Sequence, residues 1–554
     1  MTAFSRDLID ATRGITPADA VFKNASIFNP FTCTWEQGTL AVKNGIILGI
    51  GDYTGKKEYD LNGKFIIPGL IDAHVHIESS LLIPREYARL VAQHGTATVI
   101  ADPHEIANVA GVAGINWMLS QRAGLPVDIQ YMIPSCVPAT PMDVGGAILD
   151  APHLAGFKGR EGVLGLGEMM DFPGVLGADP AIGKKLEIFS LRDGHAPMLS
   201  GNDLNAYILA GLQSDHECTS RDEAEEKLKK GMYIYIREGS TEHNIEELAP
   251  LITPLTVSRC CFATDDCHVD LLMEDGHIDR CIRKAIACGV APELAIRMAT
   301  LSAAERFGLT DRGALSPGRR ADFCVIEDPR QFIVGQVFVA GKALADTLPG
   351  GDTSLPPTFR CTVPSADAIR IHGTGTARVI GIVQHQIVTE YLQIPMNERA
   401  QSNHDILKVV VCNRYGTGAC GVGLVRGFKF TTGAIASSVA HDAHNVIAVG
   451  TSDDAILRAI GAVIKMQGGM VAVLGDEETN FPLDCGGLMS TLPYLKVASR
   501  LQELHGVTDK MGTIDDPFMY LSFLSLTVIP SLRITERGVF DAGEFRDVPL
   551  FTGT

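Results

Sequence analysis

Two histidines separated by one residue, His74 and His76, end the apolar run FIIPGLIDAHVHI. A nearly continuous apolar run is typical of a strand that is covered on both faces. Because side chains alternate along a strand, both imidazoles project to the same side and can share a metal ion. An isolated pair of this kind is weak evidence, since many such histidines are structural or face solvent. Residues elsewhere in the chain are therefore needed to indicate whether a metal centre is present.

Seven further runs follow, most of them an apolar stretch that ends in polar residues. They are TATVIADPHE, DIQYMIPSCVP, GVLGLGEMMDFPG, LRDGHAP, LQSDHE, GMYIYIREGS and CCFATDD. The residues that close the fourth, fifth, sixth and eighth of the eight runs are Glu168, His195, His216, and Asp265 with Asp266. Burying so many ionisable groups together without a cation would cost several kcal/mol per unpaired charge. The pattern therefore predicts a metal centre.

The nature of the ligands indicates what this centre could do. An all-nitrogen and oxygen set suits manganese, iron or zinc and does not single one out. Glu168 could bridge two ions, and two ions holding one water would lower the pKa of that water towards roughly 7. Asp265, at the end of the last strand, is best placed to take the proton from that water and pass it to a leaving group.

The segments between the runs, such as LLIPREYARLVAQHG and RDEAEEKLKKG, have the composition and length of helices. Eight strand–helix units predict an α/β fold with a (β/α)8 TIM-type barrel of roughly 250 residues, whose catalytic groups lie at the carboxyl ends of its strands. Short alternating strands on both flanks predict a small β-sandwich unit. We expect these parts: 1–64, N-terminal segment and first half of the β-unit; 65–310, barrel; 311–347, second half of the β-unit; 348–365, linker; 366–554, a C-terminal α/β or α+β domain.

Composition narrows the class of substrate. The net charge of -18, with no basic run, argues against nucleic acid and anionic membranes and favours a small neutral or cationic molecule. No apolar segment is long enough for a span of about 20 residues, and the first twenty residues do not form a signal peptide. The 13 cysteines include no C-x-x-C pair, which argues against a disulfide framework. The cytoplasm is the expected location.

The order of these residues along the strands resembles that of the amidohydrolase superfamily. Within it, PGLIDAHVHIESS, TATVIADPHEIANVAG, GLGEMMDFPGV, DGHAP, YIYIREGS and FATDD are similar to bacterial adenine deaminases, as are SSVAHDAHN and GGLMS in the last domain. Hydantoinase-like relatives use a carbamylated lysine as the bridge between the metals, whereas this chain has Glu168 there.

The resemblance implies attack of a metal-bridged hydroxide on C6 of adenine, which gives hypoxanthine and ammonia. It implies two divalent ions, Mn²⁺ or Fe²⁺ ahead of Zn²⁺, and a homo-oligomer is expected. The metal shell carried over is His74, His76, Glu168, His195, His216 and Asp265. Two alternatives stay open: a hydrolase of another aminopurine or a cyclic amide, and a purine-binding protein without activity.

Other polar residues in the same motifs have more than one possible role. Asp102 and His104 could add metal ligands and Glu105 could act in catalysis, for example by protonating the ring nitrogen, although Asp102 could instead cap a helix. The residues that could contact substrate are Asp266, Arg237, Glu238 and Ser240, with a rim ion pair as the alternative for the REGS segment.

The last domain contains the motif VAHDAHN, with His441, Asp442 and His444. Histidines in loops are more often structural or exposed than metal-bound. We expect this loop to close over the barrel mouth or over an adjacent subunit.

Overall fold

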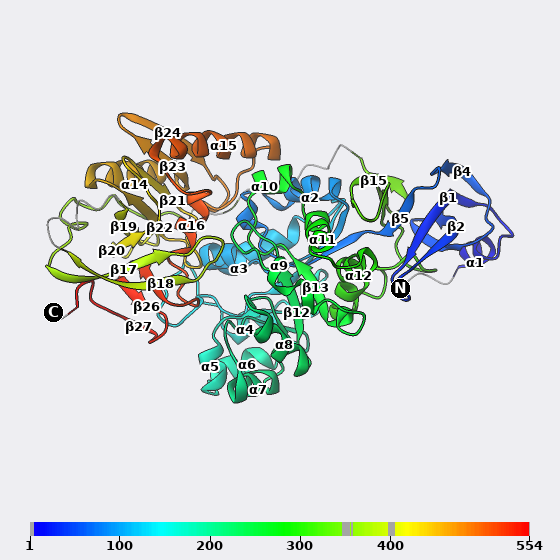
Figure 1. The fold of residues 1–554 in the computed structure, drawn as a ribbon, viewed down its shortest axis with the longest axis horizontal. Helices are drawn as coiled ribbons and strands as arrows, with labels where there is room; N and C mark the ends of the chain where they lie inside the picture. The colour runs from blue at the N-terminus through cyan, green and yellow to red at the C-terminus, as the bar shows by residue number, and fades with distance from the viewer. Residues whose placement is uncertain (1–4, 346–354, 356–357, 397–404, 553–554) are drawn as a thin grey trace.

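The computed structural model describes residues 5–345, 355, 358–396 and 405–552. A small sheet lies at one end of the molecule and the C-terminal sheet at the other, with the barrel between them (Figure 1). Among the described residues, no helix is both long enough and apolar enough to cross a membrane.

The small sheet takes strands from both flanks of the barrel, in the order β16-β15-β14-β5-β1-β2-β3, and β4 also pairs with β1. Helix α1 (Arg6–Thr12) precedes it. The strands are β1 (Ala18–Asn29), β2 (Thr34–Lys43), β3 (Ile46–Ile50), β4 (Gly55–Asp60), β5 (Phe65–Pro68), β14 (Phe323–Ile326), β15 (Val334–Val339) and β16 (Lys342–Ala343). Antiparallel pairing of β14 with β5 joins the two flanks. The expected β-unit from both ends of the barrel is present.

The barrel consists of eight parallel strands: β6 (Leu70–Val75), β7 (Thr96–Ala101), β8 (Asp128–Ile133), β9 (Val163–Met169), β10 (Arg192–Gly194), β11 (Ser214–Asp215), β12 (Tyr233–Arg237) and β13 (Cys260–Ala263). Strands β6 to β10 form one hydrogen-bonded run and β11 to β13 another. A parallel bridge between Val75 and Asp265 joins the first strand to the end of the last. This closure places the carboxyl ends of all eight strands at one mouth, which confirms the predicted barrel.

Helices alternate with the barrel strands along the chain (Figure 1). They are α2 (Pro84–Gln93), α3 (His104–Ser120), α4 (Ala151–Ala155), α5 (Phe172–Leu176), α6 (Pro180–Leu186), α7 (Gly201–Leu209), α8 (Arg221–Lys229), α9 (Ile245–Leu248), α10 (Val269–Glu274), α11 (Ile278–Ala287), α12 (Pro292–Arg297) and α13 (Ala303–Arg306). Helix α8 illustrates the local reasons for helix formation, because it has acidic residues in its first turn and lysines in its last, which complement the helix dipole.

One strand differs from the expectation. The run FIIPGLIDAHVHI was expected to form a single strand, but it divides at Gly69 into β5 of the small sheet and β6 of the barrel. A Cβ at Gly69 would lie 2.5 Å from the Cβ of Ala97, so only glycine allows this close crossing. A continuous apolar run cannot reveal such a division, because both strands are buried.

The C-terminal domain is a mixed sheet in the order β18-β17-β20-β19-β22-β21-β23-β24. Its strands are β17 (Gly375–Ile382), β18 (Thr389–Met396), β19 (Ile406–Cys412), β20 (Cys420–Arg426), β21 (Ala434–Ser437), β22 (Val446–Gly450), β23 (Gly469–Leu474) and β24 (Glu477–Pro482); β25 (Leu532–Thr535), β26 (Gly538–Asp541) and β27 (Arg546–Asp547) form a separate small sheet.

Alternate residues of this sheet pack on different helices, as the two-residue period of strands requires. Val410 and Ala436 pack with α14 (Asp453–Met466). Val409 and Ile435 belong to the core that includes α15 (Tyr494–Met511), α16 (Pro517–Phe523) and barrel residues. The face of the sheet that contains Val409 and Ile435 therefore packs the C-terminal domain against the barrel.

The predicted linker, 348–365, lies partly outside the described residues. Its described residues, 355 and 358–365, form neither helix nor strand.

Candidate active site and metal centre

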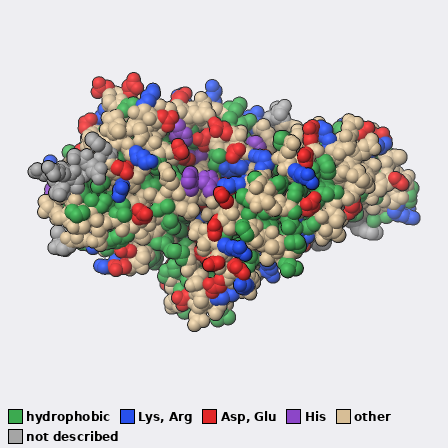
Figure 2. Space-filling model, viewed as in Figure 1, with side chains coloured by type: hydrophobic (Ala, Val, Ile, Leu, Met, Phe, Trp, Pro, Cys, Tyr) green, Lys and Arg blue, Asp and Glu red, His purple; other side chains and the backbone are tan. Residues whose placement is uncertain are grey.

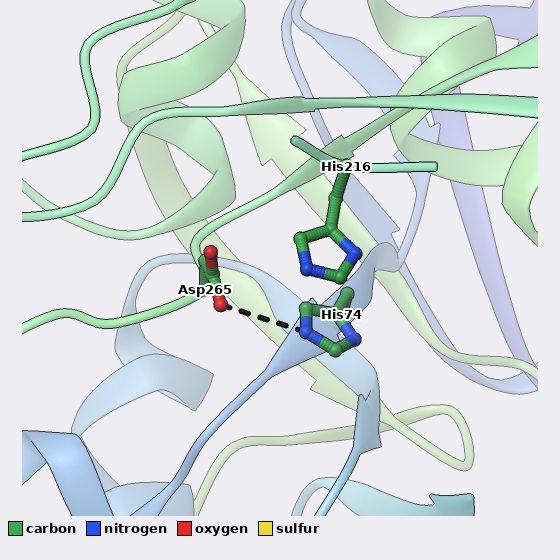
Figure 3. A group of neighbouring side chains, drawn as sticks. All are labelled: His74, His216 and Asp265. Atoms are coloured by element: carbon green, nitrogen blue, oxygen red, sulfur yellow. Dashed lines mark ion pairs between the residues drawn. The ribbon is translucent and has the colours of Figure 1, made fainter. Parts of the chain in front are cut away.

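Six polar side chains meet at the barrel mouth, each from the end of a strand or the turn that follows it. They are His74, His76, Glu168, His195, His216 and Asp265, and each is at most 4% exposed. His74 and Asp265 form one ion pair of this cluster, and the ring of His216 stacks on that of His74 (Figure 3). The structure thus brings together all six residues of the predicted metal shell.

Glu168 lies at the centre of the cluster. Its Oε1 is 3.5 Å from His74 Nε2 and 3.3 Å from His76 Nε2. Its Oε2 is 2.8 Å from His195 Nδ1 and 3.2 Å from His216 Nε2. One carboxylate oxygen therefore faces each histidine pair, which is the arrangement expected of a carboxylate between two cations.

Asp265 is held from two sides. Its Oδ1 lies 3.0 Å from His76 Nε2, while its Oδ2 accepts a hydrogen bond of 2.8 Å from Arg237 Nη1. Its backbone has φ 56°, a left-handed conformation, and its N–H donates to the carbonyl of His74. Sheet pairing and Arg237 together aim one oxygen at the histidines. The predicted rim ion pair of Arg237 exists, but it is buried and it positions Asp265.

Sequence reasoning missed Glu217. Its Oε1 is 3.3 Å from His216 Nε2 and 3.7 Å from His195 Nδ1, and Arg237 forms two hydrogen bonds with its carboxylate. The residue stands next to His216 in the motif SDHE. Because β11 ends at Asp215, strand alternation no longer separates the two side chains, and both turn into the site.

The cluster has strongly shifted ionisation. Burial by itself would lower the pKa of His76, but Asp265 and Glu168 raise that pKa well above its usual value. Burial would raise the pKa of Glu168, but His216 and His195 lower it well below its usual value. The carboxylates are therefore ionised and the site attracts positive charge, which suits cations at least as well as protons.

Hydrogen bonds from neighbouring residues fix the ligands. Asp72 Oδ1 accepts from the N–H groups of His74 and Thr264, which ties β6 to the end of β13. Asp102 Oδ2 accepts from the Glu168 N–H at 3.0 Å. A Cβ on Gly167 would lie 2.0 Å from that oxygen, so glycine is required there. Such outer contacts are typical of metal sites.

The donor set fits divalent cations. Three overlapping groups have ligand atoms within 4.8 Å of one another: His74 with His76 and Glu168, His74 with His216 and Asp265, and Glu168 with His195 and His216. All donors are imidazole nitrogens or carboxylate oxygens, the set that suits manganese, iron or zinc. The groups share members, as the ligands of two neighbouring ions would.

The pocket over this cluster has walls from both the barrel and the C-terminal domain. Its lining comprises His76, His104, Glu168, Met170, His195, His216, Glu217, Arg237, Asp265, Asp266, Ile387, His441, Asp442, Phe523 and Leu526. In Figure 2, histidine side chains are visible near the middle of the molecule, where these two parts meet. The VAHDAHN loop therefore closes over the barrel mouth of its own chain, one of the two positions expected for it.

The polar residues that follow the second strand, and Asp266 after the eighth, lie in different places. His104 and Asp266 line the pocket. Asp102 supports Glu168, and the expected alternative, a helix cap by Asp102, is wrong, because Pro103 is the cap residue of α3 and no side chain bonds the cap. Glu105 lies outside the lining, where its Oε1 is 2.7 Å from Ser79 Oγ.

Two residues of the REGS motif are not brought to the pocket. Glu238 Oε1 lies 2.5 Å from Lys284 Nζ and 2.6 Å from His243 Nδ1. Ser240 Oγ accepts from the His268 N–H. Glu238 follows Arg237 directly, and neighbouring side chains at a strand end point to opposite sides, so Arg237 turns inward and Glu238 outward.

Comparison with known proteins agrees with this geometry. Residues 65–344 match the amidohydrolase family, and residues 386–546 match the adenine deaminase C-terminal domain. An adenine deaminase of Methanoregula boonei is 62% identical over 551 residues, 98% of each chain. One of Methanoculleus marisnigri is 58% identical over 514 residues, 92% of this chain and 99% of that protein.

A solved structure of N-acetyl-D-glucosamine-6-phosphate deacetylase from Mycobacterium smegmatis is 17% identical, with a TM-score of 0.47, and covers 59% of this chain and 100% of its own. The two family matches fall on the barrel and on the C-terminal domain, which are the two parts of the chain that line the pocket. On the strength of the family matches and of the identity over its full length, this chain belongs to the amidohydrolase family and, within it, to the adenine deaminases.

Proposed function

We propose that this chain hydrolyses adenine to hypoxanthine and ammonia, with two divalent cations held by Glu168 and the five residues around it. The observation that carries the proposal is the division of the Glu168 carboxylate, one oxygen toward His74 and His76 and the other toward His195 and His216. The substrate is taken from the relatives, which are named adenine deaminases. Bound cations would supply the acidity that makes water a nucleophile near neutral pH.

Asp265 is the proposed proton carrier. Burial would raise the pKa of Asp265, but His74, His76 and Arg237 lower it well below its usual value, so the side chain is an ionised acceptor. Arg237 occupies Oδ2, which leaves Oδ1 toward the site. Asp265 would receive the proton of the attacking water and deliver it to the leaving amine.

A chain of three side chains could protonate the purine ring. Ser79 Oγ lies 2.7 Å from Glu105 Oε1 and also forms a short hydrogen bond with Asp266 Oδ1. A hydroxyl has one proton, so one of the two carboxyl groups must donate to it. Burial, together with Glu78 and Asp266, raises the pKa of Glu105 well above its usual value, so Glu105 is the protonated member. We propose the route Glu105 to Ser79 to Asp266, which lines the pocket.

The metal is proposed as Mn²⁺ or Fe²⁺, with Zn²⁺ as the alternative, because the ligands are nitrogen and oxygen only. A cytoplasmic location and a homo-oligomer also remain proposals. Cell fractionation and light scattering of the purified chain would test them.

The test of function is ammonia release, with ultraviolet spectra recorded alongside. Metal-stripped protein is reloaded with Mn²⁺, Fe²⁺ or Zn²⁺ and given adenine, guanine or a dihydropyrimidine. We expect turnover of adenine only, dependent on metal. Turnover of a different substrate would favour another aminopurine or cyclic-amide hydrolase. Tight adenine binding without ammonia release would favour a purine-binding protein.

A further inference from the structure

A second group of potential ligands lies where the C-terminal domain meets the barrel. His104 begins α3 of the barrel, whereas His441 and Asp442 belong to the loop between β21 and β22. Each residue is at most 5% exposed, and one potential ligand atom from each lies within 4.8 Å of the other two. Two domains therefore bring three donors to one point.

Several potential ligand atoms of this group have no hydrogen-bond partner among the described residues, although His104 Nδ1 lies 3.5 Å from Glu168 Oε1. His104 Nδ1, His441 Nε2 and Asp442 Oδ2 are buried without a hydrogen bond. A buried polar atom without a hydrogen bond is unfavourable, and more so when it is charged. The ion pairs of Asp442 are with imidazoles only, 3.3 Å to His104 Nε2 and 3.9 Å to His441 Nδ1, whereas Glu217 in the same pocket has Arg237. Asp442 is thus a buried carboxylate that lacks a permanent cation among its described contacts.

The spacing matches that of a metal site. Ligands bound tetrahedrally at about 2.0–2.1 Å from zinc are separated from each other by about 3.3 Å. The distance from His104 Nε2 to Asp442 Oδ1 is 3.3 Å. Two histidines and one carboxylate form a common ligand set for Zn²⁺, with the fourth position open.

Further donors stand behind the three. Glu105, His441 and His444 form another group with ligand atoms within 4.8 Å. Glu105 Oε2 and His444 Nε2 are 3.5 Å apart, and both are buried without a hydrogen bond. His441 belongs to both groups, so the loop also presents an alternative set of ligands that does not include Asp442.

We propose that His104, His441 and Asp442 bind a third divalent cation, which connects the C-terminal domain to the barrel beside the two cations of the Glu168 cluster. The total of three rests on the two cations of the proposed function. The third ion would have a ligand set of its own, apart from Glu168, and two of its three ligands would come from the C-terminal domain.

The experiment is a metal count on the full chain. Protein stripped with a chelator is titrated with Co²⁺, then desalted and analysed for bound metal, and the visible absorption of Co²⁺ is recorded. We expect three tight equivalents in the unaltered chain and two in H441N, D442N and the double variant, with loss of one absorption component. Glu168→Gln should lose the other two equivalents.

The matched control is His505→Gln, which changes another histidine of the C-terminal domain that contacts the barrel but lies outside this group. It should keep three equivalents. Circular dichroism identifies any variant that fails to fold, and the titration of the unaltered chain decides the count without variants. Two equivalents in the unaltered chain, or three in the double variant, would overturn the third site while leaving the proposed function intact. No loss in Glu168→Gln would instead contradict the proposed function.

Discussion

The Glu168 cluster and the His441 group consist of the same residue types but are positioned by different means. Four histidines and two carboxylates of the first come from strand ends, where neighbouring strands are hydrogen-bonded to one another. The second joins a helix start in the barrel to a loop of another domain. A closed sheet can fix ligands without outside help, whereas the second group exists only while two domains are docked.

The contacts that hold the VAHDAHN loop show that the His441 group depends on domain docking. The His441 N–H donates to the carbonyl of Ser522 in α16, and its ring stacks on Phe523 at 4.8 Å between centroids. The other end of α16 is anchored by Asp516, whose Oδ2 is 3.1 Å from His268 Nδ1 of the barrel. The loop is therefore held indirectly, through a helix that has its own ion pair with the barrel.

Loss of the bridging carboxylate should have the largest effect. Glu168→Gln removes the charge between the histidine pairs, so both barrel cations should be lost and kcat/KM for adenine should fall by about 10⁴-fold or more, since the nucleophile itself depends on metal. Steady-state kinetics and elemental analysis measure this. The control is Glu161→Gln, an exposed residue just before β9, which should behave as the unaltered chain. Retained metal in Glu168→Gln would contradict the role of Glu168 between the two barrel cations.

Asp265→Asn should reduce kcat by about 10²- to 10⁴-fold, the usual contribution of a positioned acid–base group. Asparagine tolerates the left-handed backbone at this position but cannot take up the proton. Metal content should stay near that of the unaltered chain, which separates proton transfer from metal binding. Near-normal turnover would refute the proton-carrier role.

The stability of the barrel should also depend on a buried ion pair next to the Glu168 cluster. Lys227 Nζ lies 2.9 Å from Asp215 Oδ2, and both side chains are fully buried next to His216. Lys227→Met would leave Asp215 without its cation, which should lower the free energy of unfolding by about 3–5 kcal/mol. Urea titration measures the change. Lys229→Met, on the exposed side of α8, should alter it little, and an equally small change in Lys227→Met would contradict the expectation.

The smallest effect should be the pH dependence of the free energy with which the VAHDAHN loop is held against the barrel. Burial would lower the pKa of His268, but Asp516 raises it above its usual value. A raised folded pKa means that this pair stabilises docking fully below about pH 6.5, the unfolded value, and that the contribution is lost as pH rises through the folded pKa. The low-pH limit is set by Asp516, since His268 and His505 lower its pKa even though burial would raise it.

Hydrogen exchange of residues 439–445 should therefore show an opening free energy that falls between pH 6 and pH 9, because the raised pKa of His268 makes its pair with Asp516 weaken over this range. Exchange of β9 should not change with pH in this way. D516N, which can still cap α16, should remove the difference. A pH effect equal in the loop and in β9 would show that the two regions are not held independently.

The sequence predicted the barrel cluster well because a strand has a fixed period and a barrel gathers strand ends at one mouth. His74, His76, Glu168 and Asp265 each lie at the end of a strand or within two residues after it, so their convergence followed from the fold class. Glu217 lies at the same distance beyond β11, but it was missed because it is adjacent to His216, and strand alternation would turn only one of two neighbouring side chains into the site. The place of Glu238 was missed for the opposite reason, because the period that turns Arg237 inward turns Glu238 outward.

What the sequence by itself determined was the set of ligand types, the barrel that gathers them and, through its motifs, the family. These depend on local periodicity and on residue identity, both of which are visible in one dimension. Only the tertiary structure decided which oxygen of Glu168 faces which histidine pair, and that the loop of His441 and Asp442 closes the same mouth. The contact of Asp442 with His104 joins residues more than 300 positions apart, and no local pattern encodes the docking of one domain on another.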